Sequence, residues 1–216
     1  ITAANLRPSG CGHAWFVDPR PTPGTLAAGR HITEQWLQVL REQGLAVASV
    51  RGGMFESAHA GECAPAIPRE TRGCVLIHPG SGGRAKCWPL ERFLELADRL
   101  APRRVAWMLG PAEVESERAR FARLRGRITR TGEELIVEGD VVAAAERIGA
   151  AALYVGNDAG MTHVAAAMGV PTVAIFGATD ARVWRPLGSD VRVAGAGRAE
   201  WAEVEEVVRA CDGGWS

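Results

Sequence analysis

The stretch "CVLIHPGSGGRAKCWPLERFLELADRL", residues 74–100, joins a short apolar run to an amphipathic segment through a glycine-rich loop. The run at its start is too short for a helix and ends in Pro-Gly, which predicts a buried strand and its exit loop. Apolar residues recur at helical spacing over 90–100, which predicts a helix. A strand, a loop and a helix in this order form the repeating unit of parallel α/β sheets.

The same unit recurs to the end of the chain. Further strands are predicted at 104–111, 134–139, 152–156, 171–177 and 190–195. Helices are predicted at 112–126, 140–150, 158–169 and 198–211, the second capped by Asp140. Continuous apolar strands that alternate with helices indicate a doubly wound parallel sheet covered on both faces.

Residues 1–72 have a different texture, rich in proline and glycine. Helical spacing is clear only over 31–44, with Thr33 as the expected N-cap and Gly44 as the expected stop. We therefore expect residues 1–72 to be the tail of one domain plus a linker, and 73–216 to be a second domain. The start in irregular text at Ile1 suggests a fragment or a trimmed chain.

Charge and cysteine content narrow the function classes. Lys plus Arg and Asp plus Glu number 25 each, which gives no reason to expect nucleic acid as a partner. The five cysteines form no CxxC pair, so a reduced compartment is expected and a structural zinc site is not. No apolar run reaches the length of a membrane span. We expect a cytoplasmic protein with at most peripheral membrane association.

In a doubly wound sheet, ligands bind at the carboxyl ends of the strands, so the loops at these ends are the candidate site. The loop 78–89 carries Ser81, Gly82 and Lys86 before the next helix. Glycines let backbone N–H groups approach an anion, and the lysine adds a positive charge. Neither a Walker A motif nor a GxGxxG fingerprint is present. A flexible loop with a solvated lysine explains this text equally well.

The loop 156–163 feeds a helix and concentrates polar groups. Asp158 is at the expected N-cap, and Gly160 lets the first helical turn approach a ligand. Unpaired N–H groups at a helix N-terminus form a ready phosphate site, and His163 could donate a hydrogen bond to a phosphate bound there. Taken alone, the simpler explanation is that Asp158 only caps the helix and that His163 is a buried histidine with satisfied hydrogen bonds.

Two further strand ends carry carboxylates. Glu113 follows the second strand, where an acidic side chain can bind ribose hydroxyls or interact with the helix dipole. Thr179 and Asp180 follow the fifth strand.

Taken together, these loops resemble glycosyltransferase family 9, the ADP-heptose:lipopolysaccharide heptosyltransferase group. The resemblance is carried by "HPGSGGRAKCWPLERFLELADRL", "LGPAE" and "VGNDAGMTHVAAAMGVPTVAIFGATDARVWRP", in the right order over about residues 73–190. "HITEQWLQVLREQGL" (31–45) is also similar to the helix that closes the N-terminal domain in that family.

The resemblance implies a GT-B fold, in which two Rossmann-like domains face each other across a cleft. It implies that 73–216 bind a nucleotide diphosphate sugar such as ADP-heptose, and that the first domain binds a lipopolysaccharide or other glycan acceptor. The donor site implied by motif match comprises Ser81, Gly82, Lys86, Glu113, Asp158, Ala159, Gly160, His163, Thr179 and Asp180.

The chain departs from the family at two points. Ala159 stands where a threonine or serine is usual, which removes one possible phosphate hydrogen bond. The catalytic carboxylate is not visible, because most of the acceptor domain would lie before Ile1. We expect inverting sugar transfer in which Lys86, rather than a metal, stabilises the leaving diphosphate. The alternatives are a non-catalytic nucleotide-sugar-binding module, or another GT-B enzyme such as a nucleotide-sugar epimerase.

Overall fold

The computed structural model describes residue 18 and residues 20–44, 73–116, 118–195 and 200–213. The chain divides into two compact units, residues 1–50 and 51–216, which are described separately below. In the described part of the chain no helix is long and apolar enough to cross a membrane.

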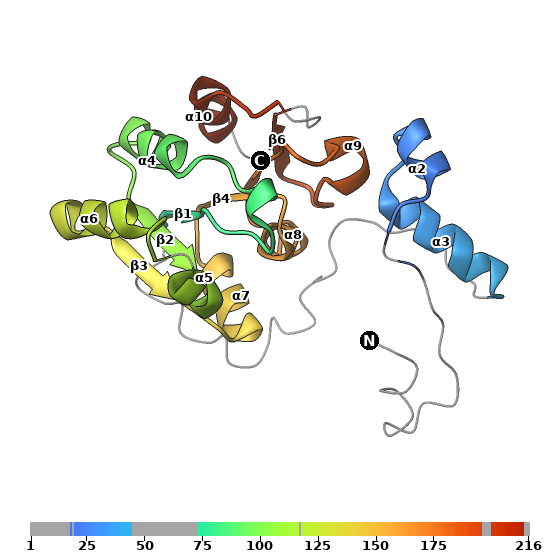
Figure 1. Cartoon of the computed structure of the whole chain (residues 1–216), viewed down its shortest axis with the longest axis horizontal. Helices are drawn as coiled ribbons and strands as arrows, with labels where there is room; N and C mark the ends of the chain where they lie inside the picture. The colour runs from blue at the N-terminus through green and yellow to red at the C-terminus, as the bar shows by residue number, and fades with distance from the viewer. Residues whose placement is uncertain (1–17, 19, 45–72, 117, 196–199, 214–216) are drawn as a thin grey trace, which may run out of the picture. The chain divides into compact units, whose positions relative to one another are not determined.

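The second unit is built on one sheet of six parallel strands (Figure 1). The strands are β1 (Val75–His78), β2 (Val105–Leu109), β3 (Glu134–Val137), β4 (Leu153–Asn157), β5 (Thr172–Ile175) and β6 (Val191–Ala194). Their order is β3-β2-β1-β4-β5-β6, that of a doubly wound Rossmann sheet. The α/β prediction is confirmed, and the order reverses between β1 and β4. That switch point is where such sheets bind ligands.

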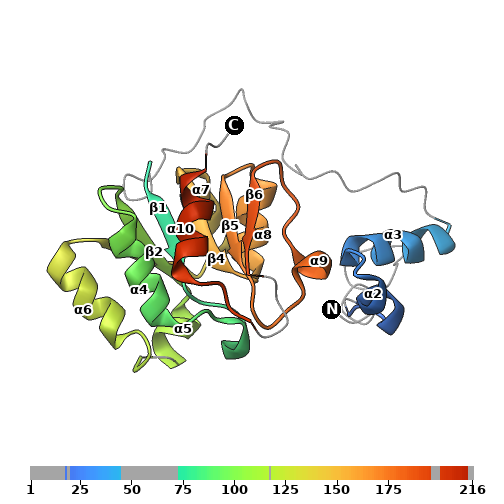
Figure 2. The same ribbon diagram turned by 90° about the horizontal axis from the view of Figure 1, so that it is seen from above.

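Helices cover both faces of this sheet, which explains why its strands read as continuous apolar runs. On one side lie α4 (Leu90–Arg99), α6 (Ala122–Thr131) and α10 (Val204–Asp212), as Figures 1 and 2 both show. On the other lie α7 (Val141–Gly149) and α8 (Gly160–Ala167). Every residue of β1, β2, β4 and β5 is buried, whereas the edge strands β3 and β6 are only partly so.

The predicted helix 112–126 is wrong, because two helices occupy this region. Helix α5 covers Pro111–Ser116, and α6 begins only at Ala122 and runs past Gly126 to Thr131. Phe121, the N-cap residue of α6, is fully buried in the cluster that α4 shares with the sheet. Burial of this aromatic ring sets the direction of α6, and helical periodicity does not record that break.

The last predicted helix is also shorter than expected, since α10 starts at Val204. Before it, the carbonyl oxygen of Ala202 accepts hydrogen bonds from the indole of Trp88, at 2.9 Å, and from Arg92, at 2.7 Å. These tertiary bonds tie the segment to the start of α4, so it does not continue the helix. Two short elements were not predicted in this unit, η2 (Arg84–Lys86) and α9 (Ala181–Trp184).

The first unit shows α2 (Pro23–Ala28), which was not predicted, and α3 (Ile32–Glu42), which was. The expected N-cap Thr33 is wrong: the His31 ring accepts from the Thr33 N–H and so caps α3 two residues earlier. Gly44 follows the C-cap with φ +87°, a left-handed conformation that favours glycine and ends the helix as predicted.

Two glycine substitutions test this packing with opposite signs. An ideal Cβ on Gly177, just after β5, would lie 2.3 Å from the Trp201 indole. Gly177→Ala is therefore expected to lower the free energy of unfolding by about 1–3 kcal/mol. Gly126→Ala is expected to raise it by about 0.5–1 kcal/mol, because a Cβ there meets no atom and alanine favours helix. Urea denaturation of both variants checks this, and equal signs would contradict it.

Candidate functional site

The loops after β1 and β4 meet at the switch point and are held together by Asn157. This side chain is fully buried and accepts the Trp88 N–H at 2.8 Å. Its amide donates to the carbonyl oxygens of Pro79 and Gly80, each at 3.0 Å. A side chain at the end of β4 thus fixes both ends of the glycine-rich loop after β1.

A polar cluster forms around the carboxylate of Asp158. Lys86 Nζ lies 2.9 Å from Asp158 Oδ2, and the Thr179 hydroxyl donates to the same oxygen at 2.7 Å. His163 Nε2 lies 3.7 Å from Oδ1. Burial alone would raise the pKa of Asp158, but contacts with His163, Thr179 and Lys86 outweigh it, so the pKa lies below its usual range.

The structure therefore corrects two predictions made for this loop. Asp158 does not cap the helix: the N-cap of α8 is Ala159, which has extended backbone angles and makes no side-chain hydrogen bond. His163 is not buried, since 42% of its side chain is exposed. Because an alanine cannot cap, the first N–H groups of α8 remain available at the positive end of the helix.

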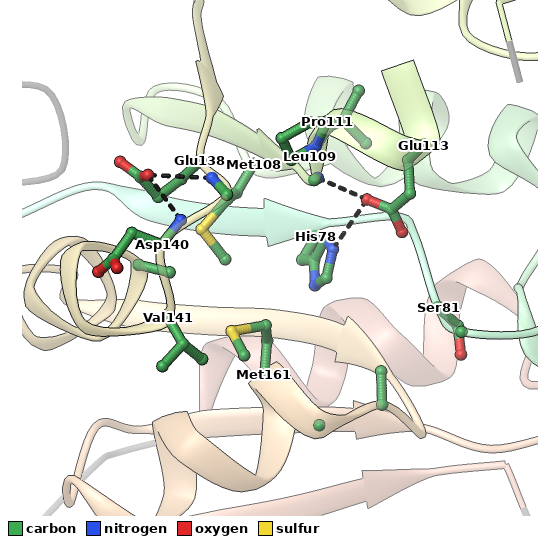
Figure 3. A pocket seen from close by; sticks show the side chains of 16 residues that line it. His78, Ser81, Met108, Leu109, Pro111, Glu113, Glu138, Asp140, Val141 and Met161 are labelled. Carbon is green, nitrogen blue, oxygen red and sulfur yellow. Dashed lines mark hydrogen bonds and ion pairs between the residues drawn. The ribbon is translucent and has the colours of Figure 1, made fainter. Parts of the chain in front are cut away.

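Beside this cluster lies a cavity of about 310 Å³, seen from close by in Figure 3. Its walls combine apolar side chains with three carboxylates, those of Glu113, Glu138 and Asp140. Ser81 and Gly82 come from the loop after β1, and Ala159, Gly160 and Met161 from the start of α8. The remaining lining residues are His78, Met108, Leu109, Gly110, Pro111, Gly139, Val141 and Ala144. The cavity thus opens along the carboxyl ends of β1, β2 and β3.

Glu113 is anchored on the cavity wall through one oxygen. Its Oε2 accepts the Gly110 N–H at 2.7 Å and lies 3.3 Å from His78 Nε2, as the dashed lines of Figure 3 show. Burial alone would raise the pKa of Glu113, but the hydrogen bonds from His78 and Gly110 outweigh it and keep the pKa below its usual range. Glu113 is therefore a carboxylate, able to accept hydroxyl groups in the cavity.

The structure gathers nine of the ten predicted site residues into these two adjoining places. Five line the cavity, namely Ser81, Gly82, Glu113, Ala159 and Gly160. Four form the cluster, namely Lys86, Asp158, His163 and Thr179. The hydroxyl of Ser81 donates to the Asp158 carbonyl at 3.4 Å and links the two. Asp180 is the exception: it caps α9 and pairs with Arg182.

Sequence reasoning missed three polar residues of the site. His78 ends β1, Tyr154 lies within β4, and Glu138 receives the N–H groups of Gly139 and Asp140. His78 stands at the end of a predicted strand, and this position was a usable signal. Nothing in the sequence around Tyr154 indicates that its hydroxyl makes a hydrogen bond in the site. In the described residues, no three His, Cys, Asp or Glu side chains are grouped so as to hold a metal.

Comparisons with known proteins point to one family. The profile of "Glycosyltransferase family 9 (heptosyltransferase)" matches residues 9–211. Lipopolysaccharide heptosyltransferase 3 of Escherichia coli K12 is 28% identical over 175 residues, which cover 76% of this chain and 48% of that protein. The chain therefore spans about half the length of the curated relative it matches.

Two solved structures share the fold. One is E. coli ADP-heptose lps heptosyltransferase II, at 25% identity and TM-score 0.55, covering 67% of this chain and 46% of that one. The other is E. coli heptosyltransferase WaaC with ADP, at 18% identity and TM-score 0.63, covering 85% and 57%. The second likeness concerns the fold alone.

Proposed function

The chain belongs to glycosyltransferase family 9, and from that membership we propose that it supplies the donor-binding half of a heptosyltransferase-like enzyme. The reaction is transfer of a heptose-like sugar from a nucleotide diphosphate to a lipopolysaccharide or other glycan acceptor. The observation that carries this proposal is the pairing of a carboxylate-lined cavity with an uncapped helix N-terminus and a lysine at the switch point.

Each part of a nucleotide diphosphate sugar has a matching place in this arrangement. The apolar walls of the cavity suit a base, and Glu113 suits the ribose hydroxyls. The N-terminus of α8, with Ala159 and Gly160, suits the diphosphate, because its free N–H groups attract anions. Lys86 also suits the diphosphate, and Asp158, His163 and Thr179 suit the sugar end beside it.

The proposed chemistry is inverting transfer. A carboxylate removes the proton of the acceptor hydroxyl, which attacks the anomeric carbon from the face opposite the diphosphate. Negative charge grows on the departing diphosphate, and Lys86 together with the α8 N-terminus stabilises it without a metal. We assign no catalytic base to residues 73–216; the proposal places it in an acceptor-binding domain.

The acceptor is proposed to be a glycan or a lipid-linked glycan, in the cytoplasm or at the inner face of the inner membrane. The second candidate is a module that binds the nucleotide sugar without turnover. Its support is Ala159, which stands where a threonine or serine is usual in the family and lacks the hydroxyl.

Calorimetry with ADP tests the donor-binding proposal directly. The chain is expected to bind ADP, because the cavity, the helix N-terminus and Lys86 together meet its base, ribose and phosphates. A transferase assay with ADP-heptose and a lipopolysaccharide acceptor then separates the enzyme from the non-catalytic module. A folded chain that releases no heat with ADP or another nucleoside diphosphate would remove the proposal.

A further inference from the structure

His78 is buried at the floor of the cavity with both ring nitrogens engaged. Nε2 lies 3.3 Å from Glu113 Oε2, and Nδ1 lies 3.0 Å from the hydroxyl oxygen of Tyr154. His78 is 7% exposed and Tyr154 is fully buried. Three side chains from α5, β1 and β4 thus form one continuous polar line at the floor of the cavity.

The direction of this line follows from which atoms can donate. Glu113 is a carboxylate and only accepts, so the proton between it and His78 belongs to Nε2. In the neutral imidazole, Nδ1 is then the acceptor. The buried Tyr154 hydroxyl keeps its proton, since burial raises its pKa, and it donates to Nδ1. Glu113 therefore selects the Nε2-protonated tautomer of His78, and Tyr154 supports this tautomer by donating to Nδ1.

The line also leaves one side of the Glu113 carboxylate for a ligand. Both of its anchoring contacts, to His78 and to the Gly110 N–H, fall on Oε2. Its other oxygen lies over Gly80, where an ideal Cβ would come within 1.6 Å of Oε1. Any side chain at position 80 would displace this carboxylate, so Gly80 completes the cradle.

We propose that His78, locked by Tyr154, is a positioning residue that aims Glu113 at the vicinal hydroxyls of the donor's ribose. The inference rests on the proposed function for the identity of the ligand. A carboxylate held at one oxygen and free at the other accepts a diol in one fixed orientation. A carboxylate without His78 rotates, and it loses affinity for the diol while the rest of the nucleotide still binds.

The test compares ADP with 2′,3′-dideoxy-ADP, which lacks both ribose hydroxyls. Tyr154→Phe and His78→Leu are each expected to weaken ADP binding by about tenfold and to leave the dideoxy compound unchanged. His78→Gln, whose amide still donates to Glu113, is expected to keep most of the preference for ADP. The control is Thr172→Val, which removes another fully buried hydroxyl of the same sheet, bonded to the Val170 carbonyl at 2.7 Å.

If His78 and Tyr154 have a purely structural role, Tyr154→Phe and His78→Leu weaken the binding of both nucleotides equally, and that result overturns the inference. Long-range ¹H–¹⁵N spectra of the ligand-free chain add a readout that does not depend on nucleotide. The expected spectrum shows His78 protonated at Nε2, and protonation at Nδ1 alone would refute the relay. Absence of ADP binding in the unsubstituted chain would remove the proposed function and the ribose role together, with the tautomer still decided by the spectrum.

Discussion

Replacement of Asn157 by leucine is expected to lower the free energy of unfolding by about 2–6 kcal/mol, because it leaves two buried polar groups unpaired and each costs about 1–3 kcal/mol. The leucine side chain has the same branching and number of heavy atoms but can neither accept from Trp88 nor donate to Pro79 and Gly80. The Pro79 carbonyl keeps its hydrogen bond from Arg120, whereas the Trp88 N–H and the Gly80 carbonyl lose theirs in a buried place that water does not reach. Chemical denaturation monitored by tryptophan fluorescence measures the loss.

The matched control is again Thr172→Val, which removes one buried hydrogen bond from the neighbouring strand β5. It is expected to cost about 1 kcal/mol. If Asn157→Leu costs no more than this control, Asn157 does not clamp the loop. The clamp also predicts that Asn157→Leu weakens ADP binding, since the released loop carries Ser81 and Lys86.

The sequence predicted the layers of this fold well, because buried parallel strands leave long apolar runs that need no tertiary information. Five of the six strands fall within predicted segments, and β4 runs one residue past its predicted end, to Asn157. Errors arose where a tertiary contact overrides local preference. Burial of Phe121 breaks a helix that periodicity joined, and bonds to the Ala202 carbonyl delay the start of α10. The predicted domain boundary at 72/73 lies beside residues 45–72, outside the described part of the chain, and stays a prediction.

The candidate site was predictable as a set of loops and less so as a set of contacts. Strand ends of a parallel sheet meet at one edge, so Ser81, Glu113 and Asp158 could be grouped without coordinates. The partner of each could not be inferred. Lys86 reaches Asp158 across 72 positions, and His78 reaches Tyr154 across 76. A single sequence carries no trace of such pairs, so it predicts a helix cap at Asp158 although this carboxylate contacts Lys86 and Thr179.

Substitution of Lys86 by alanine is expected to weaken ADP binding by about ten- to a hundredfold, because it removes a charge-assisted contact with the diphosphate. Adenosine, which has no phosphate, is expected to bind both proteins equally. In an enzyme assay the rate constant for transfer is expected to fall by about 10²–10³, since the charge on the leaving group then lacks its cation. Calorimetry with the two ligands and initial rates with ADP-heptose measure these effects.

The control for Lys86 is Arg84→Ala, which removes an exposed cation from the same short helix η2. It is expected to change the affinity for neither ADP nor adenosine.

A further readout comes from Asp158, whose carboxylate Lys86 contacts in the free protein. A carboxyl group whose pKa is lowered by folding stabilises the folded state above its unfolded pKa, and that contribution is lost as pH falls through the folded value. Without Lys86 the pKa of Asp158 rises, so stability should depend less steeply on pH in the acid range. If Lys86→Ala weakens the binding of adenosine as much as that of ADP, the lysine stabilises the loop and does not contact the diphosphate. The proposed leaving-group role then fails.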